Sequence, residues 1–554
     1  MIRDRLRNPE YVRKNRWLTL LVLCMSLMII GLDNTILNVA LPTLARPHSL
    51  GGLSASGSQL QWVVDSYVIV FAGLLLSAGS LGDRFGRYRC LALGLGVFGL
   101  GSVLSAFASS ASTLIGTRAL MGVGAAFIMP ATLSIITNVF HDPRERAKAI
   151  GVWAGVSAIG IASGPLLGGA LLEHFWWGSV FLVNVPVVAT ALVLGYVLIP
   201  DSRDPSAPKL DALGSLLSIV GLATLLWGII EAPGQGWGSP EVLTAFAVGG
   251  LVVIAFVLWE LHSKHPMLDV RVFENPRFSA ASGAITLTFL ALFGTIFLLT
   301  QYMQLVLGYS TLKVGAVLLP HAVVLMVLAP LSPRWVHRFG SKRVIATGMV
   351  IASFGLLLMA TFTVHSSTLS VIVIMMVLAS GFAQILAPAT ESIMGSLPRE
   401  KAGVGSAMND TTRQIGGAIG VAVFGSIVAS TYRSEMSSAL DGKVRPGVLD
   451  AASDSVGAAI GAARNLAAPA ASRVVEAAQA SFVSGFHVAV IVGAAIVLLG
   501  ALGVLRWLPA RVNEEPPESI PTAGAQLNAR EPEPGYEVPR PAVTTRFEDG
   551  LPLQ

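Results

Sequence analysis

The amino-acid sequence predicts an all-α protein that crosses a membrane many times. Its mean hydropathy is +0.69, and 12% of its 554 residues are charged whereas 53% are hydrophobic. A soluble protein of this length could not cover its surface with so few charges. Fourteen apolar segments are each about 20 residues long, the length that a helix needs to cross a bilayer. The expected fold is therefore a polytopic bundle of fourteen transmembrane helices.

Repeated motifs indicate that the chain contains two copies of one ancestral unit. The segment 130–135 (PATLSI) returns as 388–393 (PATESI), 84–87 (RFGR) returns as 338–341 (RFGS), and 143–147 (PRERA) returns as 398–402 (PREKA). The three shifts are 258, 254 and 255 residues, so one duplication explains all of them. Internal repeats determine the architecture. In a strongly apolar chain, two such halves predict a transporter whose substrate site lies between them.

The predicted spans form two six-helix bundles plus two inserted helices. The repeats fall in the second to fifth spans and again in the tenth to thirteenth, so the seventh and eighth spans are the inserted pair. The predicted spans are 17–41, 61–82, 90–109, 112–137, 148–172, 179–199, 211–231, 240–261, 278–304, 313–334, 343–363, 368–395, 403–429 and 483–507.

Charge placement and composition predict the domain boundaries. Lys and Arg gather in the short loops on one side, which places that side and both termini in the cytoplasm. Spaced apolar residues such as Val456 and Ile460 predict short amphipathic helices on the outer surface within an Ala-rich loop, 430–482. A tail rich in Pro and Glu is expected to be disordered. The expected parts are a basic cytoplasmic N-terminus (1–16), an N-terminal bundle (17–200), the inserted helices (201–265), a C-terminal bundle that includes the outer loop (278–507) and a cytoplasmic tail (510–554).

Several function classes find no support in the sequence. The segment 94–99 fits G-x-G-x-x-G, but it lies inside an apolar span with no strand before it, so we interpret it as helix packing. No G-x-x-x-x-G-K-[ST] segment supports an ATP-driven pump. Cys24 and Cys90 fall in or beside apolar segments and are interpreted as packing residues. We therefore expect no enzyme activity, no metal, no cofactor and no nucleic-acid partner.

Charged residues inside the predicted spans are costly, so each is a functional candidate. Asp33 lies about 13 Å from the outer end of the first span, Arg118 about 9 Å into the fourth and Asp65 about 6 Å into the second. These three residues could share one depth in the outer half of the membrane. A guanidinium favours a charged carboxylate whereas burial disfavours it, and this competition suits a proton-binding site. The alternatives are a static ion pair that fixes helix packing and, for Asp65, a solvated helix end.

The second half has its own polar residues. Asp410 and Arg413 lie three positions apart in the thirteenth span and can meet on one helical face, where they either take part in transport or neutralise each other. Glu391 lies about 6 Å from the inner end of the twelfth span, within easy reach of water. His321 in the tenth span could titrate near neutral pH, although a lone buried histidine is more often a hydrogen-bonded core residue.

Two predicted spans are rich in small residues. The fifth carries Gly160, Gly164, Pro165, Gly168 and Gly169, and the thirteenth carries Gly416, Gly417, Gly420 and Gly425. Glycines at these spacings let helix backbones approach each other, and Pro165 predicts a kink. Such faces suit a sliding contact between two bundles, and simple tight packing explains them equally well.

Several segments resemble a known family. Residues 79–87 (GSLGDRFGR) resemble the signature loop between helices 2 and 3 of the major facilitator superfamily, Arg118 with Gly122 and Gly124 resembles its helix-4 motif, and 160–169 resembles the helix-5 motif of its antiporters. Residues 32–42 (LDNTILNVALP) resemble the first helix of its fourteen-span drug:proton antiporters. Residues 62–67 (WVVDSY) and 177–186 (WGSVFLVNVP) are similar to quaternary-ammonium efflux pumps of the QacA/SmvA type. The resemblance covers nearly all of residues 15–507.

The resemblance implies the superfamily fold and proton-coupled export by alternating access. It implies that Asp33 and Asp65 bind protons or a cationic drug, and that Arg118 couples proton binding to the conformational switch. Asp410 falls where the QacA-type pumps have an acidic residue in helix 13. It also implies a latch between the halves at the cytoplasmic face, formed by Gly79, Gly82, Asp83, Arg84, Gly86 and Arg87. The corresponding loop of the second half, 335–343, lacks the Gly-x-Leu-x-Asp part, so the latch is expected on one side only.

The sequence thus predicts a plasma-membrane antiporter that exports lipophilic, mainly cationic drugs or antiseptics in exchange for protons. Its expected partners are these small molecules, protons and membrane lipids, and relatives of this kind are usually monomers. The expected proton- or substrate-binding residues are Asp33, Asp65, Asp410 and Glu391, and the expected coupling residues are Arg118 and Arg413. The alternative is a dedicated exporter of one endogenous metabolite, lipid or self-made antibiotic.

Overall fold

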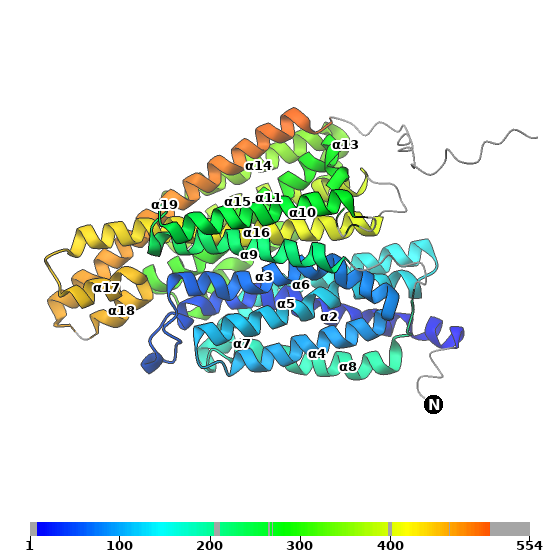
Figure 1. The fold of residues 1–554 in the computed structure, drawn as a ribbon, viewed down its shortest axis with the longest axis horizontal. Helices are drawn as coiled ribbons and strands as arrows, with labels where there is room; N and C mark the ends of the chain where they lie inside the picture. The colour runs from blue at the N-terminus through cyan, green and yellow to red at the C-terminus, as the bar shows by residue number, and fades with distance from the viewer. Residues whose placement is uncertain are drawn as a thin grey trace, which may run out of the picture. The chain divides into compact units, whose positions relative to one another are not determined.

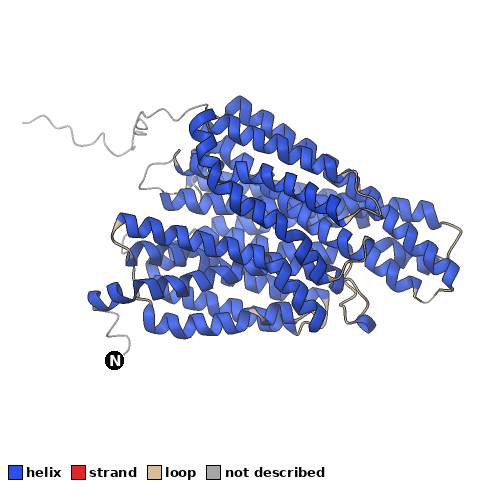
Figure 2. Cartoon of the chain, turned by 180° about the vertical axis from the view of Figure 1, so that it is seen from behind, coloured by secondary structure: helices blue, strands red, loops and turns tan. Residues whose placement is uncertain are grey.

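A computed structural model describes residues 8–203, 211–263, 266, 268, 270–396, 402–464 and 466–509, and leaves some helix side chains within these ranges undescribed. Every regular element in these ranges is a helix (Figures 1 and 2). The all-α fold class is therefore confirmed. The predicted tail, 510–554, lies outside the described residues.

The first half consists of six long helical segments. They are α2 (Pro9–Leu44), α3 (Gly57–Phe85), α4 (Arg87–Ala106), α5 (Ala111–Val139), α6 (Pro143–His174) and the interrupted segment α7 (Ser179–Leu182) with α8 (Asn184–Leu198); a short turn, η1 (His48–Leu50), follows α2. Capping residues set several of the helix starts. Ser56 and Ser110, for example, accept hydrogen bonds from the backbone N–H groups of Gln59 and Thr113 at 3.2 and 3.1 Å.

An inserted pair and a second half follow. The pair is α9 (Ala212–Gln235) and α10 (Pro240–His262), followed by the turn η2 (Val270–Glu274). The second half consists of α11 (Pro276–Gln301), the π-helical turn η3 (Tyr302–Val306), α12 (Thr311–Leu328), η4 (Ala329–Leu331), α13 (Ser332–Phe339), α14 (Ser341–Met359), α15 (Thr368–Met394), α16 (Ala402–Leu440), α17 (Pro446–Asp454), α18 (Val456–Ala463) and α19 (Ala468–Trp507).

The helices match the predicted spans closely. Among the described residues, 13 stretches are long and apolar enough to cross a membrane. The remaining predicted span, 148–172, lies within α6, a helix of 32 residues several of whose side chains are not described. The fourteen-helix count therefore fits the structure.

The long helices run side by side, with α17 and α18 at one end and the start of α2 at the other (Figure 1). We call the first of these the α17 end. The loops that follow α2, α4 and α6 also lie there, since consecutive long helices alternate in direction (Figure 1).

The segment 430–482 differs from the expected outer loop. α16 continues to Leu440 and α19 begins at Ala468, so much of the segment extends two long helices. Its apolar side chains pack against protein: Val456 and Val474 are 3% and 0% exposed, and Gly457 of α18 packs against Ala45 after α2. The predicted short helices are present as α17 and α18, and their apolar residues pack against other helices of the protein.

Glycines on α6 and α16 make equivalent contacts in the two halves. A Cβ atom at Gly160 would lie 2.7 Å from the Met28 carbonyl oxygen of α2, and one at Gly416 would lie 2.3 Å from the Thr286 carbonyl oxygen of α11. Gly164 and Gly420, one turn further on, face Thr35 of α2 and Leu290 of α11. Each pair is 256 positions apart. The duplication therefore extends to individual backbone contacts, which only glycine permits at these distances.

The same two helices also join the halves. A Cβ at Gly169 of α6 would lie 2.5 Å from the Thr311 carbonyl oxygen of α12, and one at Gly425 of α16 would lie 2.5 Å from the Gln61 Cδ atom of α3. These two glycines are again 256 positions apart. Both contacts lie near the α17 end, so α6 and α16 each hold their own bundle together and touch the other one.

Candidate functional site

A carboxylate and a guanidinium meet inside the first bundle. Asp33 lies in the C-terminal half of α2, Arg118 lies about two turns into α5, and their side chains are 0% and 1% exposed. The Arg118 Nη1 atom donates to Asp33 Oδ2 at 2.5 Å. Removing one partner from a buried ion pair leaves an uncompensated charge, which typically costs about 3–5 kcal/mol. Loss of one of the two charges alone is therefore expected to destabilise this bundle.

Further groups hold the arginine in place. Its Nε atom donates to the Val63 carbonyl oxygen on α3 at 3.1 Å. Its guanidinium carbon lies 4.4 Å from the ring centroid of Tyr67, one turn further along α3. An aromatic face stabilises a cation in this position. Arg118 is therefore oriented by α2 and α3 together.

The second carboxylate oxygen of Asp33 has its own donor. The Nδ2 atom of Asn184 donates to Asp33 Oδ1 at 3.3 Å and to the Ser102 hydroxyl oxygen on α4 at 3.0 Å. Asn184 is the first residue of α8 and is fully buried, as is Ser102. Each oxygen of Asp33 thus faces a donor from a different helix.

The sequence analysis did not assign roles to Asn184, Ser102 or Tyr67. Asn184 and Tyr67 lie inside the segments that carried the family resemblance, but neutral polar residues are not costly enough in a span to stand out as candidates. Which helices meet at Asp33 follows from the packing of α2 against α5 and α8, and no local pattern in one sequence shows it.

Asp65 lies outside this network. It is fully buried on α3, and neither of its carboxylate oxygens has a hydrogen-bond partner among the described residues. It follows Gln61 by one helical turn, and Gln61 packs on Gly425 of α16. Of the three charged residues expected at one depth, the structure brings two into direct contact and leaves Asp65 without such a partner.

The polar residues of the second half are more open to solvent. Arg413 Nη1 lies 3.7 Å from Asp410 Oδ1, and their side chains are 30% and 15% exposed. Arg413 Nη2 also donates to the Thr390 hydroxyl on α15 at 3.0 Å. Glu391, the next residue on α15, is exposed. His321 on α12 is buried, and its Nε2 atom has no hydrogen-bond partner among the described residues.

The signature loop makes close contacts within its own half. Gly86 has φ +118°, and a Cβ there would lie 2.5 Å from an oxygen of Asp201, which also pairs with Arg89 at 3.2 Å. Arg87 Nη1 donates to the Ser134 carbonyl oxygen on α5 at 3.3 Å. The other residues of the expected latch are placed as follows: Gly79 packs near Pro130, Gly82 packs near Cys90, Arg84 is exposed, and the Asp83 side chain lies outside the described part of the structure.

The expected helix-5 motif divides its contacts between the two halves. Gly160, Gly164 and Gly168 face α2, whereas Gly169 faces α12. The carbonyl oxygen of Pro165 lies 2.4 Å from where a Cβ of Gly315 on α12 would be placed. The Thr311 hydroxyl donates to the Gly169 carbonyl oxygen at 3.0 Å. One end of α6 is thus part of the contact between the halves.

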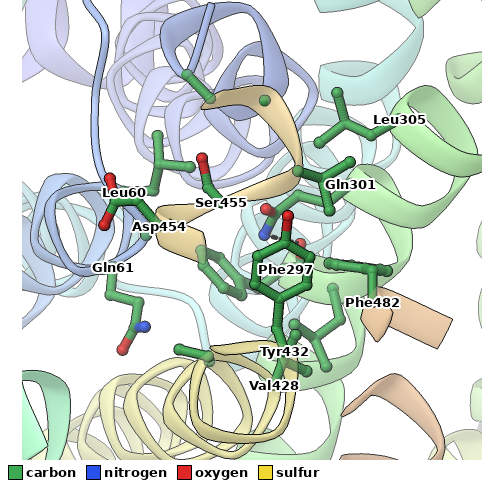
Figure 3. A pocket seen from close by; sticks show the side chains of 17 residues that line it. Leu60, Gln61, Phe297, Gln301, Leu305, Val428, Tyr432, Asp454, Ser455 and Phe482 are labelled. Carbon is green, nitrogen blue, oxygen red and sulfur yellow. Dashed lines mark hydrogen bonds between the residues drawn. The ribbon is translucent and has the colours of Figure 1, made fainter. Parts of the chain in front are cut away.

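A small cavity lies at the α17 end where both halves meet (Figure 3). Its volume is about 50 Å³. Gln61 of α3, Phe297 and Gln301 of α11, Tyr432 of α16 and Asp454 of α17 are among the residues that line it. A second link between the halves is nearby, since the Gln304 amide donates to the Val39 carbonyl oxygen of α2 at 2.9 Å. The space is too small for a drug-sized molecule, which needs a pocket of about 300 Å³ or more.

Two repeated helical bundles with a buried ion pair in one of them define a polytopic transporter of the duplicated-bundle class. No group of three or more His, Cys, Asp or Glu residues that could hold a metal ion is found in the described part of the chain. The chain belongs to the Major Facilitator Superfamily: the model of that family matches residues 23–421.

Comparison with individual proteins agrees with this assignment. The chain is 38% identical to the multidrug efflux pump LfrA of Mycolicibacterium smegmatis, with 88% of this chain and 95% of the relative covered. It is 32% identical to the methyl viologen resistance protein SmvA of Salmonella typhimurium, with coverage of 88% and 97%. It is also 32% identical to a tetracenomycin C resistance and export protein of Streptomyces glaucescens, with coverage of 92% and 95%.

A solved structure shares the fold. The crystal structure of a bacterial homologue of the human lysosomal transporter Spinster superposes with a TM-score of 0.60 at 18% identity, covering 89% of this chain and 98% of that one. At this level of identity the likeness concerns the fold alone, and it agrees with the predicted fold of the superfamily.

Proposed function

We propose that this protein is a proton-coupled antiporter that exports lipophilic, mainly cationic drugs or antiseptics by alternating access. The observation that carries the proposal is the buried contact between Asp33 and Arg118 in a chain of this family. A carboxylate inside a membrane protein is costly unless it is paired or protonated, so it suits a reversible proton site. The names of the relatives, which refer to multidrug efflux and to methyl viologen resistance, support the drug as cargo.

Asp33 is the primary proton carrier in this proposal. Loss of its proton restores the ion pair with Arg118, and gain of a proton weakens it, so the pairing of α2 with α5 changes with each cycle. Arg118 thereby couples the proton to helix packing. Asp65, buried without a partner, is the second membrane carboxylate, and it binds a proton or balances a cationic drug.

Asp410, Arg413 and Glu391 form the corresponding set of the second half. Their greater exposure supports a role in attracting cations and protons rather than in storing a proton away from water. Arg413 keeps Asp410 available as a charged partner and links it to α15 through Thr390. Hydrophobic and aromatic side chains around the drug would supply most of the contact area.

The topology follows the positive-inside rule. The α17 end is then external, and the end at which α2 begins is cytoplasmic, with both termini in the cytoplasm. The protein acts in the plasma membrane as a monomer. The signature residues Gly79, Gly82, Asp83, Arg84, Gly86 and Arg87 form the cytoplasmic latch, and Gly160, Gly164, Pro165, Gly168 and Gly169 provide the face on which α6 moves.

Transport into proteoliposomes tests this function. A fluorescent organic cation is followed under an imposed pH gradient for the wild type, for Asp33→Asn and for Asp450→Asn, which changes an exposed carboxylate on α17. Transport should depend on the gradient, stop in Asp33→Asn and persist in Asp450→Asn. Transport that continues in Asp33→Asn, or that ignores collapse of the gradient, contradicts the proposal.

The breadth of substrates has its own test. A relative of the chain is named for export of one antibiotic, tetracenomycin C. Cells that produce this protein are therefore challenged with a panel of unrelated toxic cations. Protection against many of them is expected, whereas protection against a single compound would identify a dedicated exporter.

A further inference from the structure

The amide of Asn184 faces two groups that can each donate or accept a hydrogen bond. Its Nδ2 end lies 3.3 Å from Asp33 Oδ1 and 3.0 Å from the Ser102 hydroxyl oxygen. Its Oδ1 end is buried and has no hydrogen-bond partner among the described residues. A purely apolar packing position would not need an amide, whose buried polar atoms require partners.

The arrangement matches the charged form of Asp33. A carboxylate only accepts hydrogen bonds, and an amide nitrogen has two N–H groups to give. One N–H serves Asp33 and the other serves Ser102. The Ser102 hydroxyl hydrogen is then directed at the Met121 sulfur, 4.0 Å away. Asp33 Oδ2 remains bonded to Arg118.

The same geometry also serves the neutral form after one rotation. If Asp33 gains a proton on Oδ1, that O–H becomes a donor, and the amide nitrogen no longer suits it. A half-turn about the Cβ–Cγ bond of Asn184 puts its carbonyl oxygen at this end. That oxygen has two lone pairs, so it accepts from Asp33 and from a rotated Ser102 hydroxyl at once. The rotation exchanges the nitrogen and the oxygen, so the position without a hydrogen-bond partner is the same whether Asp33 is charged or neutral.

We propose that Asn184 and Ser102 act as a protonation adapter for Asp33. They stabilise its charged form and its neutral form in turn by rotation of their own side chains. The only covalent change is the gain or loss of one O–H bond at Asp33, whose proton exchanges with water. Asn184 is thus a positioning residue, and this role rests on the proposed function of Asp33 as the proton carrier.

Few other charges act on Asp33. Arg118 of α5 and the Tyr67 phenol of α3 face it directly, and Asp65 lies on the same α3 helix. The other helices that contact α2 are α6, α7, α8, α11 and α12. The helices α7 and α8 carry no charged residue. The helices α6, α11 and α12 carry theirs within six positions of a helix end, apart from His321 in the middle of α12. Asn184 and Arg118 are therefore the side chains expected to control the proton on Asp33.

Infrared titration of the purified protein tests the adapter without requiring transport. The carbonyl band of protonated Asp33 is identified as the band lost in Asp33→Asn. In Asn184→Leu both forms of Asp33 lose a hydrogen-bond partner. The charged form loses the stronger bond, so the midpoint of this titration should move to higher pH by about one unit. Ser102→Ala should move it in the same direction by less, and Ser102→Thr, which keeps the hydroxyl, should restore the wild-type midpoint.

Ser105→Ala is the matched control, since Ser105 is buried on the same helix and bonds to Thr117 instead of Asn184. A change in the Asn184 amide carbonyl band that follows the Asp33 titration is also expected. An unchanged midpoint in Asn184→Leu, even with a lower unfolding temperature, means that Asn184 only packs the core. An Asn184 amide band that stays constant through the Asp33 titration means that the amide does not rotate. Either result overturns the proposal. If wild-type proteoliposomes show no proton-coupled transport, the proposed function is overturned instead. Failure of the adapter and failure of the proposed function are therefore distinguishable.

Discussion

At the scale of single residues, the first bundle keeps a carboxylate, a guanidinium and an amide together away from solvent. Asp33 and Arg118 are costly in a span, and this cost made them visible in the sequence. Asn184, Ser102 and Tyr67 became visible only when α2, α3, α4, α5 and α8 were seen to converge on Asp33. Neutral polar residues are common in apolar helices, so their positions in sequence carry too little information to assign a role.

A double-mutant cycle measures how strongly the pair is coupled. Arg118→Met leaves the Asp33 carboxyl buried without its guanidinium and should lower the free energy of unfolding by about 3–5 kcal/mol. The double variant Asp33→Asn/Arg118→Met removes both charges and should be more stable than Arg118→Met alone. Unfolding in detergent, followed for the wild type and three variants, gives the coupling energy. Additive costs would show that the two side chains do not stabilise each other.

At the scale of elements, α6 illustrates how small residues set helix distances. A Cβ at Gly164 would lie 2.0 Å from the Thr35 hydroxyl oxygen, whereas one at Gly155 of the same helix meets nothing within 4 Å. The glycine-rich faces were visible in the sequence. Their partners were not, because spacing shows that a helix can be approached closely without showing which helix approaches it.

Two alanine substitutions on this helix form a matched pair. Gly164→Ala forces α6 away from α2 and should cost about 1–3 kcal/mol of stability. Gly155→Ala has open space and should be neutral or stabilise the helix by up to about 1 kcal/mol, since alanine favours helices more than glycine does. Thermal unfolding of both purified variants checks the difference. Equal effects of the two changes would contradict the close contact of α6 with α2.

The helices α17 and α18 form an element whose packing should depend on pH. Burial raises the pKa of Asp454 above its ordinary value of 3.8, and the Arg433 guanidinium, 3.9 Å away, acts in the opposite direction. The folded segment therefore holds this proton to a higher pH than the unfolded segment does. Its stability is greatest below about pH 3.8 and falls as the pH rises through the folded pKa.

Hydrogen exchange of residues 446–463 measures this dependence. After correction for the intrinsic effect of pH on exchange, protection should decrease as the pH rises, by a modest amount because Asp454 is partly exposed. Asp454→Asn should show no such trend, whereas Asp450→Asn should behave as the wild type. A corrected protection that increases with pH would contradict the assigned sign.

At the scale of the whole molecule, the duplication explains more than the order of the helices. Gly169 and Gly425 occupy equivalent positions and each joins its helix to the opposite half near the α17 end. The repeated motifs predicted the two halves from sequence, and the spans were located well because long apolar runs are unambiguous. The packing of 430–482 at this end was missed, because burial of its apolar residues depends on contacts with α2 and α3.

Replacing either of these equivalent glycines by a larger residue should separate the two halves at the α17 end. Spin labels at Ser109 and His365, on loops of the two halves at this end, report the opening in a background with both native cysteines replaced. Gly169→Leu and Gly425→Leu should each lengthen the distance between the labels, since a Cβ atom at either position would lie 2.5 Å from an atom of the other half. Gly155→Leu, which has open space, should leave the distance unchanged. An unaltered distance in both variants would show that these glycines do not hold the halves together.

The most direct test of the central claim is drug-induced proton release from the purified protein. A weakly buffered sample with a pH indicator receives an organic cation, and the protons released per protein molecule are counted. The wild type and Asp450→Asn should release protons on drug binding. Asp33→Asn should release fewer protons per protein molecule, because it lacks the proton that Asp33 carries. Equal release from Asp33→Asn and the wild type would contradict the assignment of proton coupling to the buried pair of Asp33 and Arg118.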